Sequence, residues 1–175
     1  MLRSIFTMIV LVIAFAAPPT VPADITPTAS RKPLPEVALT DAKGAPVNLS
    51  AYKGRVVLLD FWATWCEGCK EEIPWFMEFQ NKYATSGLAV VGASLDEDGW
   101  KSVKPYVSEH KINYRMVVGT FESAKQFGVD KGMPVTLLID RNGMIAEVHP
   151  GMVDKDAFER EIQILLKETG RKAAN

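Results

Sequence analysis

Cysteine and histidine are scarce in this chain of 175 residues, which contains two of each. A zinc site usually needs four such ligands, and His110 and His149 lie far along the chain from Cys66 and Cys69, so we expect neither a metal nor another cofactor. An excess of charge of one sign is also lacking, because 20 basic residues balance 21 acidic ones. This balance argues against a nucleic-acid partner. The length and the 47% of hydrophobic residues fit one globular domain.

A hydrophobic run long enough to span a membrane is missing as well. The apolar stretch 8–17 follows Arg3 and precedes Pro18 and Pro19. Its core of about 10 to 13 residues falls short of the roughly 20 that a transmembrane helix requires. We therefore predict that residues 1–23 are a cleaved signal peptide and that the protein is exported to the periplasm or another extracytoplasmic site. The alternative is an uncleaved N-terminal membrane anchor.

Proline is concentrated at the start of the mature chain. It recurs through residues 18–35, which predicts an extended linker over residues 24–35 and a folded domain over residues 36–170. A short N-terminal β-hairpin is expected to open the domain, with strands at 37–39 and 47–49 on either side of a turn.

The rest of the domain alternates between strand and helix patterns, which predicts an α/β fold with a mixed central sheet flanked by helices. Residues 56–62 are almost continuously apolar, as in a strand covered on both faces, so this strand should be central. Periodicity predicts further strands at 88–95, 114–118, 135–140 and 144–149, and helices at 67–83, about 100–107, 121–127 and about 158–166.

The two cysteines form a Cys-Glu-Gly-Cys motif where the central strand passes into the first long helix. A bridge between Cys66 and Cys69 would close only a short loop, so it would stabilise the fold little, and thiol-disulfide exchange is the better use of the pair. Cys66 at the helix N-terminus is favoured as a thiolate and should attack. Cys69, one turn later, should resolve the mixed disulfide. Two structural cysteines that stay reduced are the alternative.

Two carboxylates are candidates for the proton acceptor of Cys69. Asp60 interrupts the apolar run of the central strand, where burial would raise its pKa. Glu72 lies one helical turn after Cys69. Each has a plain alternative, because Asp60 could end its strand in a solvated position and Glu72 could be an ordinary surface acid. A third candidate segment is Met133-Pro134 before a strand, where the sequence leaves the cis or trans state open.

The segment from Asp60 to Lys70, with the letters DFWATWCEGCK, resembles the active site of the thioredoxin superfamily. Together with Glu72, the hairpin, a strand-helix insertion around residues 97–128 and the export signal, it is most similar to the TlpA/ResA branch of exported thiol-disulfide oxidoreductases. The resemblance implies a thioredoxin fold over about residues 34–168.

The resemblance also implies roles for individual residues. Cys66 and Cys69 would be the nucleophile and the resolving thiol of a redox-active disulfide, and Glu72 and Asp60 the acids near it. Pro134 would be cis, Met133 would pair with a substrate strand, and Trp65 would cover the rim. The implied partners are protein disulfides, such as those of apocytochrome c or copper-handling proteins, and a membrane thiol electron donor.

Gly68 departs from the family, which usually has proline at this position. Glycine is less preorganised for the first helical turn, so the balance between dithiol and disulfide could differ, and with it the direction of electron flow. A reductase is the leading hypothesis, and a thiol oxidant or isomerase with the same site is the first alternative. A copper- or haem-handling module and a peroxidase are weaker ones, because the cysteine spacing and the position of Thr64 do not fit them.

Overall fold

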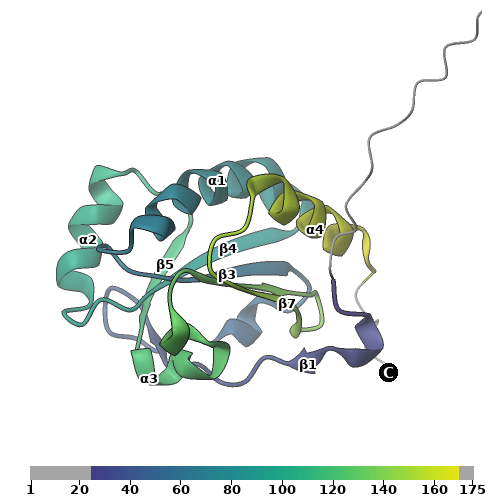
Figure 1. Ribbon diagram of the computed structural model, residues 1–175, viewed down its shortest axis with the longest axis horizontal. Coiled ribbons are helices and arrows are strands. Elements are labelled where there is room, and N and C mark those ends of the chain that lie inside the picture. The colour runs from purple at the N-terminus through teal and green to yellow at the C-terminus, as the bar shows by residue number, and fades with distance from the viewer. Residues whose placement is uncertain (1–24, 170–175) are drawn as a thin grey trace, which may run out of the picture.

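The sheet of this protein contains seven strands, in the order β1-β7-β6-β3-β4-β5-β2. The computed structural model describes residues 25–169 (Figure 1). The strands are β1 (Lys32–Pro33), β2 (Leu39–Thr40), β3 (Val56–Trp62), β4 (Leu88–Ser94), β5 (Arg115–Gly119), β6 (Val135–Ile139) and β7 (Met144–Pro150). The helices are α1 (Glu67–Tyr83), α2 (Trp100–Glu109), α3 (Phe121–Ala124) and α4 (Lys155–Lys167).

Strand β3 is central, as predicted. It pairs in parallel with β4 on one side and antiparallel with β6 on the other, and all seven of its residues are buried. Alternate residues therefore face two separate cores. Helices α1 and α4 cover one face of the sheet, where Phe76 and Phe158 pack edge to face with ring centroids 5.5 Å apart (Figure 1).

The predicted mixed sheet flanked by helices is confirmed, and α1 has the predicted bounds. The N-terminal hairpin is only partly correct. Its first arm is β2, which pairs with β5 at the sheet edge, but its second arm is a single bridge between Thr40 and Pro46. Two backbone hydrogen bonds flank this bridge: the Asp41 N–H donates to the Ala45 carbonyl and the Val47 N–H donates to the Leu39 carbonyl, both at 2.9 Å. Leu49, predicted to be in a strand, instead begins a short 3-10 helix.

The segment predicted to be a linker is part of the fold from residue 25 onward. Strand β1 pairs with β7, and the backbone N–H of Thr26 donates to the carbonyl of Ala146 at 3.0 Å. The predicted domain start at residue 36 is thus too late, because proline-rich composition does not prevent pairing at a sheet edge. The predicted signal peptide lies outside the described residues. Within residues 25–169, no helix is long and apolar enough to cross a membrane.

Arg31 ties this segment to the rest of the domain. Its side chain is buried and forms ion pairs with Asp140 at 2.9 Å and with Glu168 at 2.7 Å, and its Nε donates to the Thr26 carbonyl at 2.8 Å. Asp140 directly follows β6, beside the start of β3. The contact therefore lies at the opposite end of the sheet from the carboxyl end of β3, and it brings the two ends of the described chain together (Figure 1).

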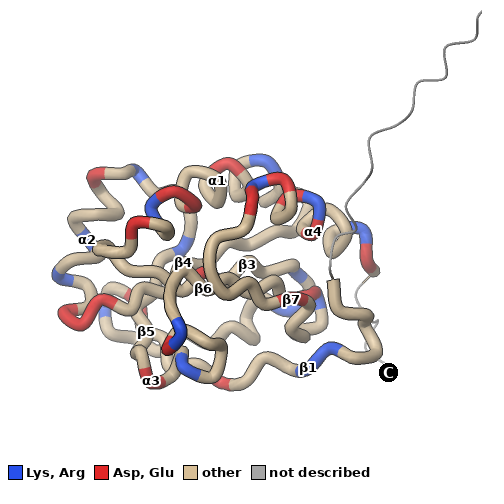
Figure 2. The backbone as a smooth tube through the Cα atoms, in the orientation of Figure 1, with Lys and Arg blue, Asp and Glu red and all other residues tan. Residues whose placement is uncertain are grey.

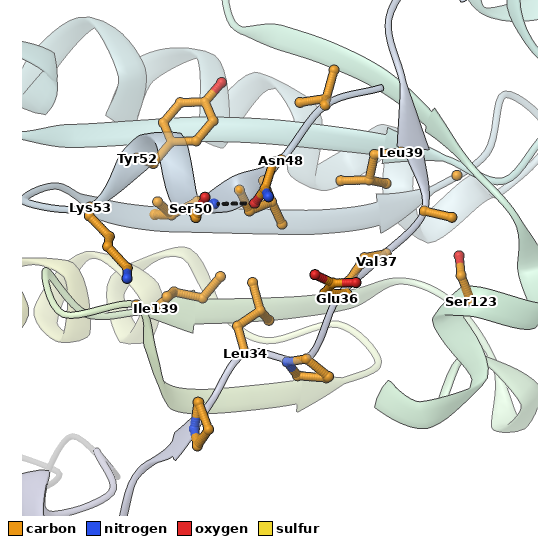
Figure 3. A pocket seen from close by; sticks show the side chains of 18 of the residues that line it. Leu34, Glu36, Val37, Leu39, Asn48, Ser50, Tyr52, Lys53, Ser123 and Ile139 are labelled. Atoms are coloured by element: carbon orange, nitrogen blue, oxygen red, sulfur yellow. Dashed lines mark hydrogen bonds between the residues drawn. The ribbon is translucent and has the colours of Figure 1, made fainter. Parts of the chain in front are cut away.

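A cavity of about 1030 Å³ lies on the face of the sheet away from α1, under the N-terminal segment (Figure 3). Its apolar lining includes Leu34, Val37, Leu39, Tyr52 and Ile139. None of the candidate site residues lines this cavity. On the molecule as a whole, acidic and basic residues are interspersed, as along α1 and α4 in Figure 2.

Replacing Arg31 with Met should lower the free energy of unfolding by about 3 kcal/mol, because Asp140 would stay buried without its cation. Urea denaturation checks this value. The neighbouring exposed Lys32→Met is the matched control and should change stability by less than about 0.5 kcal/mol. Equal losses for the two variants would contradict a specific role for the Arg31 ion pairs.

Candidate active site

Cys66 and Cys69 form a disulfide at the junction of β3 and α1, with Cα atoms 5.3 Å apart. The chain leaves the sheet after Trp62 and turns through residues 63–65, and Cys66 is the N-cap of α1. Cys66 is 7% exposed, whereas Cys69 is completely buried. Of the two cysteines, Cys66 is therefore the one that a substrate can reach.

The N-terminus of α1 surrounds the pair with backbone N–H groups. The Sγ of Cys66 accepts a hydrogen bond from the Cys69 N–H at 3.3 Å. A helix of 17 residues has a developed positive end, which stabilises a thiolate at the N-cap once the disulfide is reduced. Cys69 lies one turn further along α1, and its sulfur is bonded to that of Cys66.

Asp96 fixes the loop before Cys66, and sequence reasoning missed it. Its carboxylate accepts hydrogen bonds from the Thr64 N–H at 3.0 Å, the Thr64 hydroxyl at 2.6 Å and the Ser94 hydroxyl at 2.7 Å. The available signal was its place just after the predicted strand 88–95, at the same sheet edge as the cysteines. Asp96 thus connects the loop that presents Cys66 to the end of β4.

Asp60 and Glu72 are both buried, which excludes the alternatives of a solvated strand end and a surface acid. Asp60 lies on β3 and faces the same core as Trp62 and Cys69. Burial, reinforced by the neighbouring charge of Glu72, raises the pKa of Asp60 well above its usual range. Burial therefore favours the neutral, protonated form of this carboxyl group.

Glu72 follows Cys69 by one turn on the buried face of α1. Burial raises the pKa of Glu72 to about 7, opposed by the Val153 N–H, which donates to its Oε1 at 3.5 Å, and by the positive form of His149. A carboxyl group that titrates near neutral pH is able both to accept and to return a proton. The structure therefore places an acid of suitable pKa beside the buried cysteine.

The predicted substrate-binding residues surround the disulfide. Trp65 is 64% exposed directly before Cys66, and Met133 is half-buried. The peptide bond between Met133 and Pro134 is cis, which confirms the expectation from the resemblance. Pro134 directly precedes β6, the antiparallel neighbour of β3, so its loop lies at the same end of the sheet as the cysteines.

Met152 occupies the space beside Gly68, a contact that the sequence did not predict. A Cβ atom at position 68 would lie 3.1 Å from the Sδ of Met152 and 3.3 Å from the Cδ of Pro134. Met152 is nevertheless 47% exposed, so its side chain has room to move. In this chain the thioether therefore covers the position where the family usually has proline.

Comparison with known proteins agrees with this geometry. Residues 31–148, more than half of the chain, match the model of the AhpC/TSA family. The thiol-disulfide oxidoreductase ResA of Geobacillus kaustophilus is 30% identical over 129 residues, which cover 74% of each chain. The thioredoxin-like protein YneN of Bacillus subtilis is 29% identical over 132 residues, 74% of this chain and 76% of that one.

Among solved structures, a putative thiol:disulfide interchange protein DsbE from Chlorobium tepidum is similar. It has a TM-score of 0.67 and 35% identity over 78% of this chain and 96% of that chain. The chain therefore belongs to the AhpC/TSA family. With its Cys66–Cys69 pair, it is a thiol-disulfide oxidoreductase of the ResA and DsbE type.

The contact of Met152 with position 68 is testable by a double-mutant cycle. Gly68→Ala should stabilise α1 by up to about 1 kcal/mol, but the new Cβ must displace Met152. In a Met152→Ala background the contact with Met152 is gone and only the approach to Pro134 at 3.3 Å remains, so Gly68→Ala should gain about 0.5 kcal/mol more, as measured by urea denaturation. A cycle of Gly68→Ala with Met144→Ala, at the far end of β7, should be additive. Additivity in both cycles would contradict the contact.

The raised pKa of Glu72 predicts how the free energy of unfolding depends on pH. The folded-state pKa of Glu72, about 7, exceeds its usual value of 4.5, so the folded state binds the extra proton between these values. The contribution of Glu72 to the free energy of unfolding is then fully present below about pH 4.5. It falls as the pH rises to about 7, by at most about 1.4 kcal/mol per pH unit.

Glu72→Gln should flatten that part of the profile, because glutamine does not titrate. Denaturation at a series of pH values measures it, with the exposed Glu97→Gln, which does not act on Glu72, as control. An unchanged slope in Glu72→Gln would assign the pH dependence to another group, with Asp60 as the first candidate.

Proposed function

We propose that this oxidoreductase is exported and reduces disulfide bonds of extracytoplasmic proteins, with Cys66 as nucleophile and Cys69 as resolving thiol. Proteins such as apocytochrome c or copper-handling proteins are the proposed substrates. A membrane thiol donor would supply the electrons that convert the disulfide back to the dithiol. The apolar segment 8–17 supports export, as a signal peptide or as an anchor.

The burial of two acids next to the cysteine pair is the observation that carries the direction of this proposal. Oxidants of this superfamily are strong because their reduced, thiolate form is stabilised. Here a negative charge on Glu72 or Asp60 opposes a nearby thiolate, and Lys70 is paired with the exposed Glu67 at 2.7 Å. These features disfavour the reduced form relative to the disulfide, so the pair should have a low potential and donate electrons.

The reaction requires two exchange steps. The Cys66 thiolate attacks one sulfur of the substrate disulfide, and the other substrate sulfur leaves as a thiolate and takes a proton. Cys69 then gives its proton to a carboxylate, for which we propose Glu72 with Asp60 as the alternative. The Cys69 sulfur attacks Cys66, the second substrate thiol leaves, and the Cys66–Cys69 disulfide forms. Two electrons and two protons pass from the protein to the substrate.

Substrate binding would use the exposed rim of the site. The backbone of Met133, next to cis-Pro134, would pair with an extended segment of the substrate by edge addition. The exposed ring of Trp65 would pack against the same segment. This arrangement would place a substrate disulfide over Cys66, the less buried of the two cysteines.

The reduction potential of the Cys66–Cys69 pair tests the proposal. The full chain would be equilibrated against a dithiothreitol or glutathione series. A value near or below thioredoxin's, roughly −270 mV, would support a reductase. A value near DsbA's, roughly −120 mV, would make the protein an oxidant and overturn the proposed direction.

A trapping experiment identifies the substrates. Cys69→Ser leaves the attacking thiol but removes the resolving one, so mixed disulfides with extracytoplasmic proteins should accumulate. The control is the double variant with Cys66→Ser, which should trap nothing. Failure of Cys69→Ser to trap any protein that the control does not retain would count against a reductase of protein disulfides.

A further inference from the structure

Polar side chains form a row across the sheet, under α1 and α4. Asp60 on β3 is directly opposite Thr136 on β6, and Thr136 is directly opposite His149 on β7. Side chains of opposed residues lie on the same face of a sheet. The three residues therefore follow one another from the buried centre of the sheet toward its edge, on the face that also holds the cysteine pair.

His149 is held firmly at the outer end of this row. Its Nε2 lies 2.7 Å from the Oε2 of Glu161 on α4, and its ring packs edge to face against Phe158 with centroids 5.0 Å apart. The side chains of His149 and Glu161 are 12% and 4% exposed, so the pair is largely shielded from solvent. An ionised carboxylate only accepts hydrogen bonds, so in that state of Glu161 the contact uses an N–H at Nε2.

The inner end of the row consists of side-chain atoms with unused hydrogen-bonding capacity. Within residues 25–169, both carboxyl oxygens of Asp60, the hydroxyl of Thr136 and the Oε2 of Glu72 are buried without a hydrogen bond of normal geometry, and Thr136 is close enough to Asp60 to lower its pKa. Such groups are rare in protein interiors and concentrate where protons move. The protonation states of Asp60 and Glu72 therefore depend on the charges around these two acids.

The titratable groups near Glu72 come from α1, β3 and β7, and from the loop before β5, which contributes the buried Tyr114. Asp60 of β3 is close enough for the charge of Glu72 to raise its pKa, and Glu71 of α1 adds a second like charge. From β7 comes His149: the Val153 N–H, four residues further on, donates to the Oε1 of Glu72 at 3.5 Å, and Phe158 packs both on His149 and on Phe76, one helical turn after Glu72. The positive form of His149 lowers the pKa of Glu72. Glu161 of α4 in turn faces His149.

We propose that His149, held by Glu161, is a positioning residue for the second exchange step: its positive charge keeps Glu72 ionised and ready to accept the proton of Cys69. The inference rests on the proposed function only for the role of Glu72 in that step. The proton passes from the Cys69 thiol to the Glu72 carboxylate, the Cys69 sulfur bonds to Cys66, and the bond between Cys66 and the substrate sulfur breaks. His149 transfers no electrons and does not contact the substrate.

The two exchange steps are separable with dithiobis-nitrobenzoate, an aromatic disulfide whose released thiol is coloured. Attack by Cys66 on this probe releases the first coloured thiol, and attack by Cys69 on the mixed disulfide releases the second. Each rate would be followed from about pH 5 to about pH 9, the range in which histidine and the raised carboxyl titrate.

In His149→Gln, the midpoint of the second step should move to higher pH, because Glu72 loses its positive neighbour. A shift of half to one pH unit would slow this step about threefold to tenfold below the midpoint. The first step should keep its wild-type profile. His110→Gln is the matched control, because it removes the other histidine, which is exposed at the C-terminal end of α2, stacks on Tyr106 and does not act on Glu72, and it should leave both steps unchanged.

An unchanged second step in His149→Gln, or equal slowing of both steps, would overturn the role of His149. If this variant does not fold, Glu161→Gln keeps the size of the partner and removes the charge that pairs with the imidazole. Glu161→Gln should move the pH midpoint of the second step in the same direction as His149→Gln. An unchanged midpoint would overturn the proposal. The test does not depend on the direction of electron flow, so a high reduction potential would contradict the proposed reductase and leave the His149 result intact.

Discussion

Burial of strand β3 on both faces is the constraint on which the redox site depends. Because Val56–Trp62 lies in the middle of the sheet, between parallel β4 and antiparallel β6, its end is fixed by neighbours on both sides. The next residues have to turn out of the sheet, and Asp96 holds this turn at Thr64. Cys66 thereby becomes the N-cap of α1. The reactivity of the cysteine pair thus follows from the position of an apolar strand.

Opposing electrostatic effects meet at the cysteine pair. The N-terminus of α1 favours a thiolate at Cys66, because the backbone N–H groups of its first turn have no carbonyl partner within the helix and point toward the sulfur, as the Cys69 N–H does. The buried carboxyls of Asp60 and Glu72 oppose negative charge nearby, and burial raises the pKa of both. Glu72 titrates near neutral pH because desolvation outweighs the favourable contacts from Val153 and His149. The pKa of Glu72 thus depends on several segments, since α1 contributes Glu71, β7 contributes His149 and the segment after β7 contributes Val153.

The redox site and the Arg31 ion pairs lie at opposite ends of the sheet. At one end are the cysteines, cis-Pro134 and the exposed Trp65. At the other, Arg31 joins the N-terminal segment to the β6–β7 turn and to the end of α4. Strand β3, seven residues long, separates the two ends by about 20 Å. The N-terminal segment is therefore attached to the domain at the end of the sheet opposite the cysteine pair.

The sequence alone determined the central strand, the bounds of α1, the cysteine pair and the candidate acids, because apolar periodicity and a short motif are local properties. It did not reveal that residues 25–35 join the sheet, since the partner of β1 is more than 100 residues away and the composition resembles that of a linker. The contact of Met152 with Gly68, the bonds from Asp96 to Thr64 and the row from Asp60 to His149 likewise join distant segments. Only the tertiary structure decided that Asp60 and Glu72 are both buried, because strand register and helix packing fix which side chains lose water.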